Sequence, residues 1–126
     1  MNTFKSLCLI AAAALVLAGC GTAKSNSTPA ASYTPTLDVS ANVNGDTATI
    51  QITTDLILSK EHYDQERKQG EGHIHYSVDD GDKQILIDTK KVLDHLSKGP
   101  HSVKVSLHNN DHTPYDVSKT ISFEVK

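Results

Sequence analysis

Apolar and polar residues alternate along most of the chain after residue 35. The first alternating segment has apolar residues at Leu37, Val39, Ala41 and Val43, and residues 48–52 repeat the pattern. A period of two is typical of a β-strand with one buried face. The dipeptide Asn44-Gly45 separates the two segments and predicts a tight hairpin, since both residues tolerate positive φ.

Further segments with strand character follow at residues 73–78, 85–87, 101–108 and 121–125. The tripeptide Leu56-Ile57-Leu58 either continues the preceding strand with a bulge or starts the next turn. Residues 59–71 form a long, charged connection. Residues 88–98 have the spacing of a short helical turn, with Val92, Leu93 and Leu96 facing the core, that Gly99-Pro100 would end. About seven short strands with one long connection predict an all-β fold, an immunoglobulin-like β-sandwich. The Cys-Trp-Cys pattern of true immunoglobulin domains is missing, so the prediction concerns the architecture alone.

The N-terminal segment has the features of an export signal. Lys5 supplies a positive charge, and residues 7–18 form an apolar run shorter than the about 20 residues of a membrane-spanning helix. The run ends in Leu17-Ala18-Gly19-Cys20, which resembles the lipobox of bacterial lipoproteins. The resemblance implies a signal peptide at residues 1–19, acylation of Cys20, and a lipid anchor on the extracytoplasmic face of the cell membrane. The alternative is an ordinary secretory signal followed by an unrelated cysteine.

Composition adds limits on the rest of the chain. Residues 20–35 are rich in Thr, Ala, Ser, Asn and Pro, which predicts a flexible linker between Cys20 and a domain at residues 36–126. The net charge is −3 and falls to −4 once Lys5 is removed with the signal; without a basic cluster, this charge argues against nucleic acid as a partner. Cys8 leaves with the signal and Cys20 carries lipid, so no disulfide is predicted.

Histidines concentrate at one end of the predicted sandwich. His73 and His75 leave the same face of one strand, roughly 6–7 Å apart by strand rise. In an immunoglobulin-like sandwich the third and sixth strands are antiparallel neighbours, which places the start of residues 73–78 beside His108 at the end of residues 102–108. The adjoining loops bring three more side chains to this rim, on the face away from the core: His62, Asp111 and His112.

These side chains predict a metal site. Neutral imidazole is the commonest metal ligand among side chains, and two or three imidazoles with an oxygen ligand suit Cu(II) or Zn(II), with copper favoured by the affinity order. The predicted ligands are His62, His73, His75, His108, Asp111 and His112. No cysteine or methionine lies nearby to make a blue-copper centre. Two alternatives stay open: a structural or solvated histidine cluster, and a polar site for a partner.

Motifs for catalysis are missing from the sequence. There is no Gly-x-Ser-x-Gly elbow and no glycine-rich phosphate loop. The segment Asp79-Asp80-Gly81-Asp82 is either a hairpin turn or a weak calcium site. The open rim expected around the histidines also lacks the dry pocket of a catalytic zinc site. We therefore do not predict an enzyme.

Two segments resemble small, poorly characterised secreted domains of bacteria. Residues 70–81 read Gly-Glu-Gly-His-Ile-His-Tyr-Ser-Val-Asp-Asp-Gly, and residues 99–114 contain Leu-His-Asn-Asn-Asp-His. These domains share a Gly-His-x-His strand and a later Leu-x-Asn-x-Asp-His segment, and are similar to immunoglobulin-type sandwiches and, loosely, to copper-handling sandwich proteins of the cell envelope. The resemblance points to the residues at matching positions, which are His73, His75, Asp111 and His112.

Two functions from different classes follow from the sequence. The first is a lipid-anchored protein that binds or buffers copper or zinc outside the cytoplasm. The second is a structural or interaction module that binds another envelope protein and needs no metal. Residues 21–35 lack the histidine or methionine cluster that copper-handling envelope proteins often carry, which argues against a copper chaperone.

Overall fold

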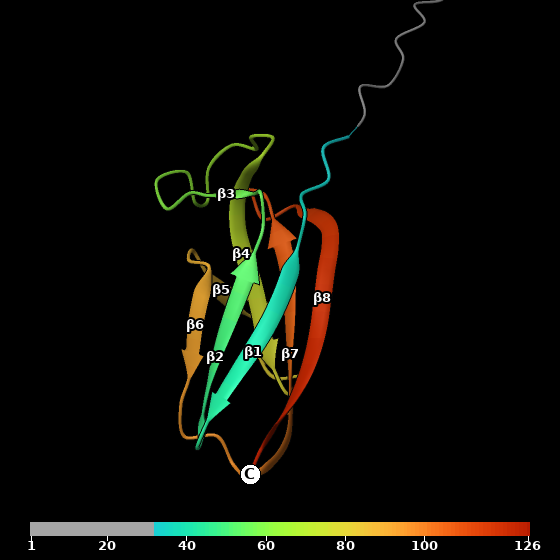
Figure 1. The fold of residues 1–126 in the computed structure, drawn as a ribbon. Coiled ribbons are helices and arrows are strands. Elements are labelled where there is room, and N and C mark those ends of the chain that lie inside the picture. The colour runs from blue at the N-terminus through green and yellow to red at the C-terminus, as the bar shows by residue number, and fades with distance from the viewer. Residues whose placement is uncertain (1–31) are drawn as a thin grey trace, which may run out of the picture. The chain divides into compact units, whose positions relative to one another are not determined.

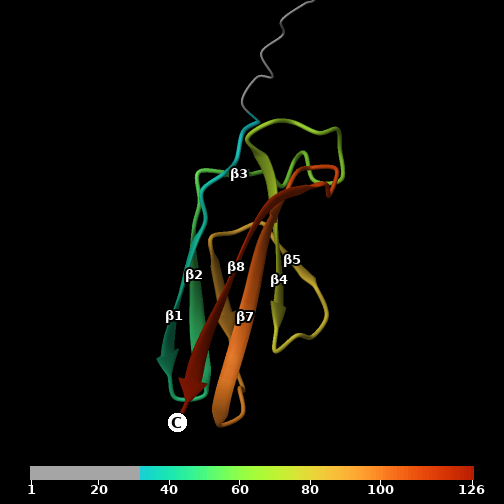
Figure 2. The same ribbon diagram turned by 90° about the vertical axis from the view of Figure 1, so that its right-hand side faces the viewer.

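The computed structural model describes residues 32–126, which form two packed β-sheets (Figures 1 and 2). One sheet has the order β1-β2-β6, with strands Asp38–Asn44, Thr47–Thr53 and Lys90–Leu93. The other has the order β3-β4-β7-β8, with strands Ile57–Leu58, Glu71–Val78, Gly99–His108 and Pro114–Val125. A fifth strand of this sheet, β5 (Gln84–Leu86), also pairs with β4. The predicted immunoglobulin-like β-sandwich is confirmed, with eight strands rather than about seven.

The predicted signal peptide (residues 1–19), the lipidation site Cys20 and most of the predicted linker lie outside the described residues. Within residues 32–126, no helix is long and apolar enough to cross a membrane. Ala31–Lys126 is one compact unit, and its core is continuous between the sheets, so this unit is expected to fold by itself.

The core comes from the alternating apolar residues. The inward-facing residues of β1 and β2 meet those of β4 and β7, and the fully or nearly buried side chains include Val39, Ile50, Ile52, Ile74, Tyr76, Val103, Val105 and Leu107. The β1–β2 hairpin is present, but its turn residues are Gly45 and Asp46, because Asn44 pairs with Thr47. Gly45 has φ 62°, which glycine adopts without strain at the first central position of such a turn.

Two local predictions were wrong. Residues 88–98 contain the strand β6, paired antiparallel with β2, in place of a helical turn. The strand is favoured because it pairs with the free edge of β2, and it leaves Val92 exposed instead of in the core. Ile57 and Leu58 form β3, which pairs in parallel with the start of β4, so the chain crosses to the second sheet before the long connection begins.

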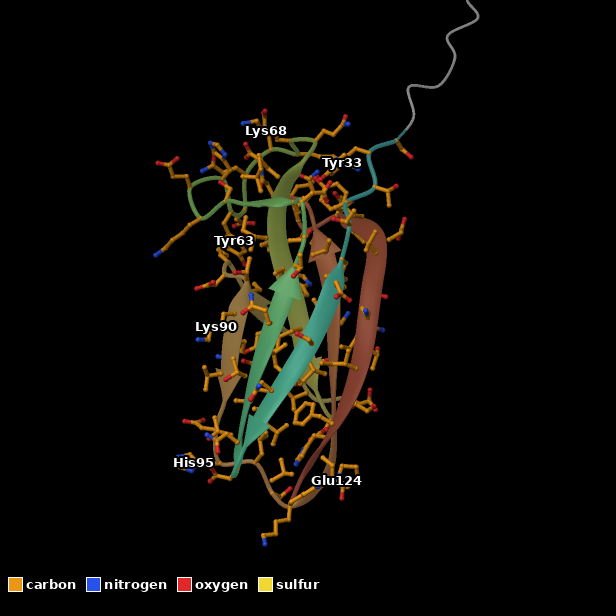
Figure 3. The ribbon with its side chains drawn as sticks, in the orientation of Figure 1. Tyr33, Tyr63, Lys68, Lys90, His95 and Glu124 are labelled. Carbon is orange, nitrogen blue, oxygen red and sulfur yellow. The ribbon has the colours of Figure 1, made fainter. Side chains whose placement is uncertain are left out.

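The two ends of the sandwich carry different histidines. Figure 3 shows Tyr63 and Lys68 towards one end and His95 at the other. At the His95 end, His101 is buried with its Nδ1 2.6 Å from Asp79 Oδ2 and its Nε2 2.7 Å from the carbonyl oxygen of Ser97. Both partners are acceptors, so both ring nitrogens donate, and the Ser97 carbonyl and the Asp79 carboxylate raise the pKa of His101 above its ordinary value.

The pKa of His101 is therefore expected to fall in an Asp79→Asn variant, because the carboxylate that favours the imidazolium is lost. An NMR titration of the imidazole protons measures the change. Asp80→Asn is the matched control, since Asp80 is the next residue of the same turn and also has positive φ. An unchanged His101 pKa in Asp79→Asn would contradict the assignment of an imidazolium to this position.

Candidate metal centre

The register of β4 and β7 brings histidines distant in sequence together. His73 lies directly opposite His108, and His75 lies opposite Ser106, which confirms the predicted pairing of the two strands. His112 follows in the loop between β7 and β8. His73, His75 and His112 each offer one ring nitrogen, and these atoms all lie within 4.8 Å of one another. We refer to these three residues as the three-histidine cluster.

The spacing within the three-histidine cluster suits a shared ion. The Nε2 atoms of His73 and His75 are 3.0 Å apart, and the ring centres of His73 and His112 are 4.6 Å apart. Two imidazole nitrogens on one tetrahedral zinc ion, each about 2.0–2.1 Å from it, lie roughly 3.3 Å from each other, close to this hydrogen-bonded pair. The His73–His75 pair already has the separation of two ligands on one ion.

The cluster is more enclosed than the sequence predicted. His73 has no exposed surface, whereas an open rim was expected, and that expectation was wrong. The connection between β3 and β4 folds over this end of the sheet and brings Tyr63 edge-on to both His73 and His112, with ring centres 5.0 and 5.1 Å away. Nδ1 of His73 has no hydrogen-bond partner among the described residues. A buried polar atom without a partner costs about 1–3 kcal/mol.

Burial also sets the charge of the cluster. Desolvation lowers the pKa of His73 to about 4, with further lowering by His75, His112 and His108. Desolvation likewise lowers the pKa of His75 to about 4, followed by the charges of His108, His112 and Lys83. Both imidazoles are neutral at pH 7, which is the form that binds metal ions.

Two strained loop residues meet beside the cluster. His112 has φ 65° and Asp64 has φ 63°, a conformation that non-glycine residues adopt rarely. Nε2 of His112 lies 3.3 Å from Asp64 Oδ1, and the Asp64 N–H donates to the Asn110 carbonyl at 3.0 Å. The sequence analysis missed Asp64, because nothing in the charged run of residues 59–71 separates it from its neighbours.

Three other predicted ligands lie outside the three-histidine cluster. His108 stacks on His75 with ring centres 3.8 Å apart, but its Nδ1 donates to the His112 carbonyl and its Nε2 accepts from Ser106 Oγ. Asp111 is exposed, and its Oδ1 accepts from the N–H and the hydroxyl of Thr113. His108 therefore holds the cluster in place through the His112 backbone, and Asp111 stabilises the loop that carries His112.

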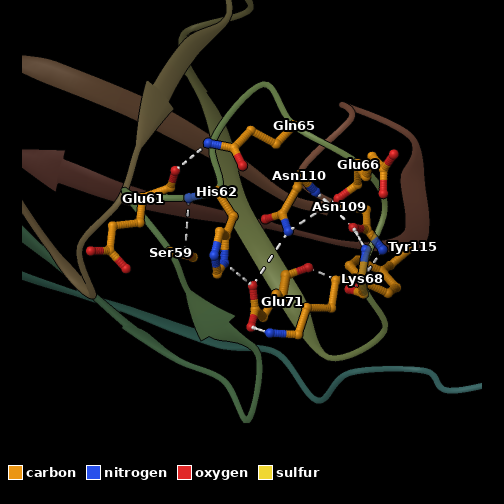
Figure 4. A network of polar contacts seen from close by, with 10 residues as sticks. All are labelled: Ser59, Glu61, His62, Gln65, Glu66, Lys68, Glu71, Asn109, Asn110 and Tyr115. Carbon is orange, nitrogen blue, oxygen red and sulfur yellow. Dashed lines mark hydrogen bonds and ion pairs between the residues drawn. The ribbon is translucent and has the colours of Figure 1, made fainter.

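The third of these, His62, belongs to a separate polar network (Figure 4). Its Nδ1 lies 2.6 Å from Glu71 Oε2, and Lys68 forms an ion pair with the other Glu71 oxygen. The Tyr115 hydroxyl donates to the Glu71 carbonyl at 2.8 Å, and Asn110 Nδ2 lies 3.4 Å from the Glu71 carboxylate. Lys68, then His62, lower the pKa of Glu71 to about 2, so Glu71 stays ionised and ties the β3–β4 connection to the start of β4.

The chain matches no family model and no curated protein sequence. Among solved structures, it is similar to the PKD1 domain of Vibrio anguillarum Epp, with a TM-score of 0.51 and 8% identity over 75% of this chain and 96% of that chain. The PKD1 domain of the Vibrio cholerae metalloprotease PrtV gives a TM-score of 0.48 and 12% identity over 74% of this chain and 98% of that chain. The likeness shows the fold alone. It supports an immunoglobulin-like domain and gives no information on the role of the histidines.

Proposed function

We propose that this protein binds a divalent transition metal ion, Cu(II) or Zn(II), through His73, His75 and His112. One observation carries the proposal: His73, His75 and His112 each place one ring nitrogen within 4.8 Å of the other two, and the Nε2 atoms of His73 and His75 are 3.0 Å apart. His73 and His75 are neutral at pH 7, so both can coordinate an ion without first losing a proton.

The donor set favours copper and zinc over other common ions. Imidazole suits both, and at equal availability the affinity order places Cu(II) above Zn(II). Three protein ligands leave at least one coordination position for water or another donor. Asp64, next to His112, is the nearest described carboxylate, and it acts either on the ion or on the orientation of the His112 ring.

The location belongs to the same proposal. Leu17-Ala18-Gly19-Cys20 supports cleavage before Cys20 and attachment of lipid to that cysteine, which would hold the domain on the extracytoplasmic face of the cell membrane. A non-catalytic protein there would bind or buffer metal ions. Incorporation of labelled palmitate into the wild type, and its loss in a Cys20→Ala variant, tests the anchor.

Metal binding is expected to weaken at least tenfold in a His112→Asn variant, because one of three ligands is lost. The matched control is His95→Asn: both histidines have positive φ, which asparagine tolerates, and His95 is exposed at the opposite end. Competition titrations of Cu(II) and Zn(II) into Ala31–Lys126 against a chelator of known affinity measure both variants. Equal affinities of the wild type and His112→Asn would refute the proposed site.

A second function, an interaction module, is favoured by a different observation. Ile57, Ile85 and Val92 are large apolar residues that remain exposed, and Ile85 and Val92 lie on the short strands β5 and β6. Exposed apolar residues on edge strands are candidate contacts for another envelope protein. This function would be favoured by a partner whose binding is lost in Ile85→Asp but unaffected by chelators.

A further inference from the structure

A groove of about 440 Å³ lies next to the three-histidine cluster, on the outer face of the second sheet. His75 and His108 line one part of it, so His75 belongs to both the cluster and the groove. The pleat of the sheet explains the polar lining, because residues opposite the core-facing positions point outward. The hydroxyl-bearing residues among them are Ser77, Ser106 and Ser118.

Two lysines flank the groove a short distance from His75. Lys104 lies opposite Ser77 across the β4–β7 pair. On the other side of β4, Gln84 pairs with Tyr76, so Lys83, one residue earlier, lies beside Ser77 as well. Ser77 is two residues from His75 on the same face, roughly 7 Å away by strand rise. The groove therefore has imidazoles at one end and two lysine side chains at the other, about 7 Å further along the sheet by strand rise.

The groove is lined by more positive than negative side chains, although the net charge of the chain is negative. The chain has a net charge of −3, yet the groove is lined by two lysines and a single carboxylate, Asp116. Asp116 lies in the irregular stretch of β8 between the partners of Ser106 and His108, which is the histidine end of the groove. Among the described residues, no carboxylate lines the lysine end of the groove, so an anion is the complementary ligand there.

We infer that the metal-loaded protein binds a short dicarboxylate in this groove, with one carboxylate on the ion and the other between Lys83 and Lys104. The inference rests on the proposed metal site, since three imidazoles leave a coordination position open and carboxylate oxygen is an accepted ligand of zinc. The second carboxylate would pair with ammonium groups flanked by the Ser77 hydroxyl. A monocarboxylate of similar chemistry can make only one of the two contacts.

Calorimetric titration of Zn(II)-loaded Ala31–Lys126 with succinate and with acetate tests the inference. Succinate is expected to bind the Zn(II)-loaded protein at least tenfold more tightly than acetate does. Its affinity for the metal-free protein is expected to be at least tenfold lower than for the Zn(II)-loaded protein. The double variant Lys83→Gln/Lys104→Gln should lose about tenfold in succinate affinity and keep its acetate and Zn(II) affinities. The control Lys90→Gln/Lys98→Gln removes the same charge from exposed lysines outside the groove and should behave as the wild type.

The outcomes separate this inference from the proposed function, because Zn(II) affinity is measured before any anion is added. If neither Zn(II) nor Cu(II) binds, the metal site and the dicarboxylate site both fail. If Zn(II) binds but succinate binds no better than acetate, or the groove variant binds succinate as the wild type does, only the dicarboxylate site is refuted.

Discussion

Replacement of His73 with leucine is expected to abolish metal binding and yet leave the metal-free protein at least as stable as the wild type at pH 7. His73 is fully buried, its Nδ1 has no partner among the described residues, and its neighbours include the Tyr63 ring. Leucine removes a buried polar atom whose lack of a partner costs about 1–3 kcal/mol. We expect a gain of about 1 kcal/mol in the free energy of unfolding, measured by urea denaturation.

The same variant should change the response to acid. In the unfolded chain His73 titrates near 6.5, whereas in the folded protein its pKa is about 4, so the unfolded state binds more protons between these values. Protonation of His73 therefore does not affect the free energy of unfolding of the wild type well above pH 6.5. As the pH drops to 4, it lowers that free energy by about 3 kcal/mol. His73→Leu removes this pH dependence. The difference in the free energy of unfolding between the variant and the wild type should therefore grow by about 2 kcal/mol, in favour of the variant, between pH 7 and pH 4.5.

The acid response of His73 is distinguishable from that of the carboxylates. Glu71, whose pKa is lowered to about 2, loses its stabilising charge only below its ordinary value of 4.5. A loss of stability between pH 6.5 and 4.5 therefore reports on histidines. A His73→Leu variant that is several kcal/mol less stable than the wild type at pH 7 would mean that His73 serves the fold, and it would count against the metal proposal.

Gly72→Ala is expected to destabilise the protein by about 3 kcal/mol or more and to weaken metal binding with it. A Cβ at position 72 would lie 1.9 Å from the carbonyl oxygen of His108 and 3.1 Å from Asn109 Cα. Both atoms belong to the backbone, so the clash is relieved only by moving β7 away from β4 beside His73. Urea denaturation and the Zn(II) titration measure the two effects.

Gly70→Asn is the matched control for Gly72→Ala. Gly70 has φ 82° and open space where a Cβ would be, and asparagine tolerates positive φ better than most residues. The control should lose less than about 1 kcal/mol. If Gly72→Ala unfolds at the same urea concentration as the control and binds Zn(II) normally, the close approach of β4 and β7 at this point is absent in solution.

The strands were predictable because one-sided burial leaves a period of two in the sequence. The opposition of His73 and His108 followed from this period together with the strand order of a sandwich. The prediction from periodicity was wrong at residues 88–98, where Val92, Leu93 and Leu96 have the spacing of one face of a helix. In so short a segment the free edge of β2 decides the outcome, and periodicity carries no information about that edge.

The candidate site was predictable only in part. His73, His75 and His112 were found from strand pairing and loop position, but the cover over His73 was not. Tyr63 and Asp64 reach the site from the long β3–β4 connection, whose course depends on contacts with Asn109, Asn110 and Tyr115 some 40 residues later in the chain. Such distant polar contacts leave no periodic signal in the sequence.

The N-terminal approach to the sandwich determines where the histidines can act. Tyr33 packs edge-on against Tyr115, whose hydroxyl bonds the Glu71 carbonyl, so the chain joins the domain at the histidine end. With lipid on Cys20, as proposed, the tether of residues 21–32 spans at most about 40 Å when fully extended. The histidine end would then be the tethered end of the domain, within about that distance of the bilayer.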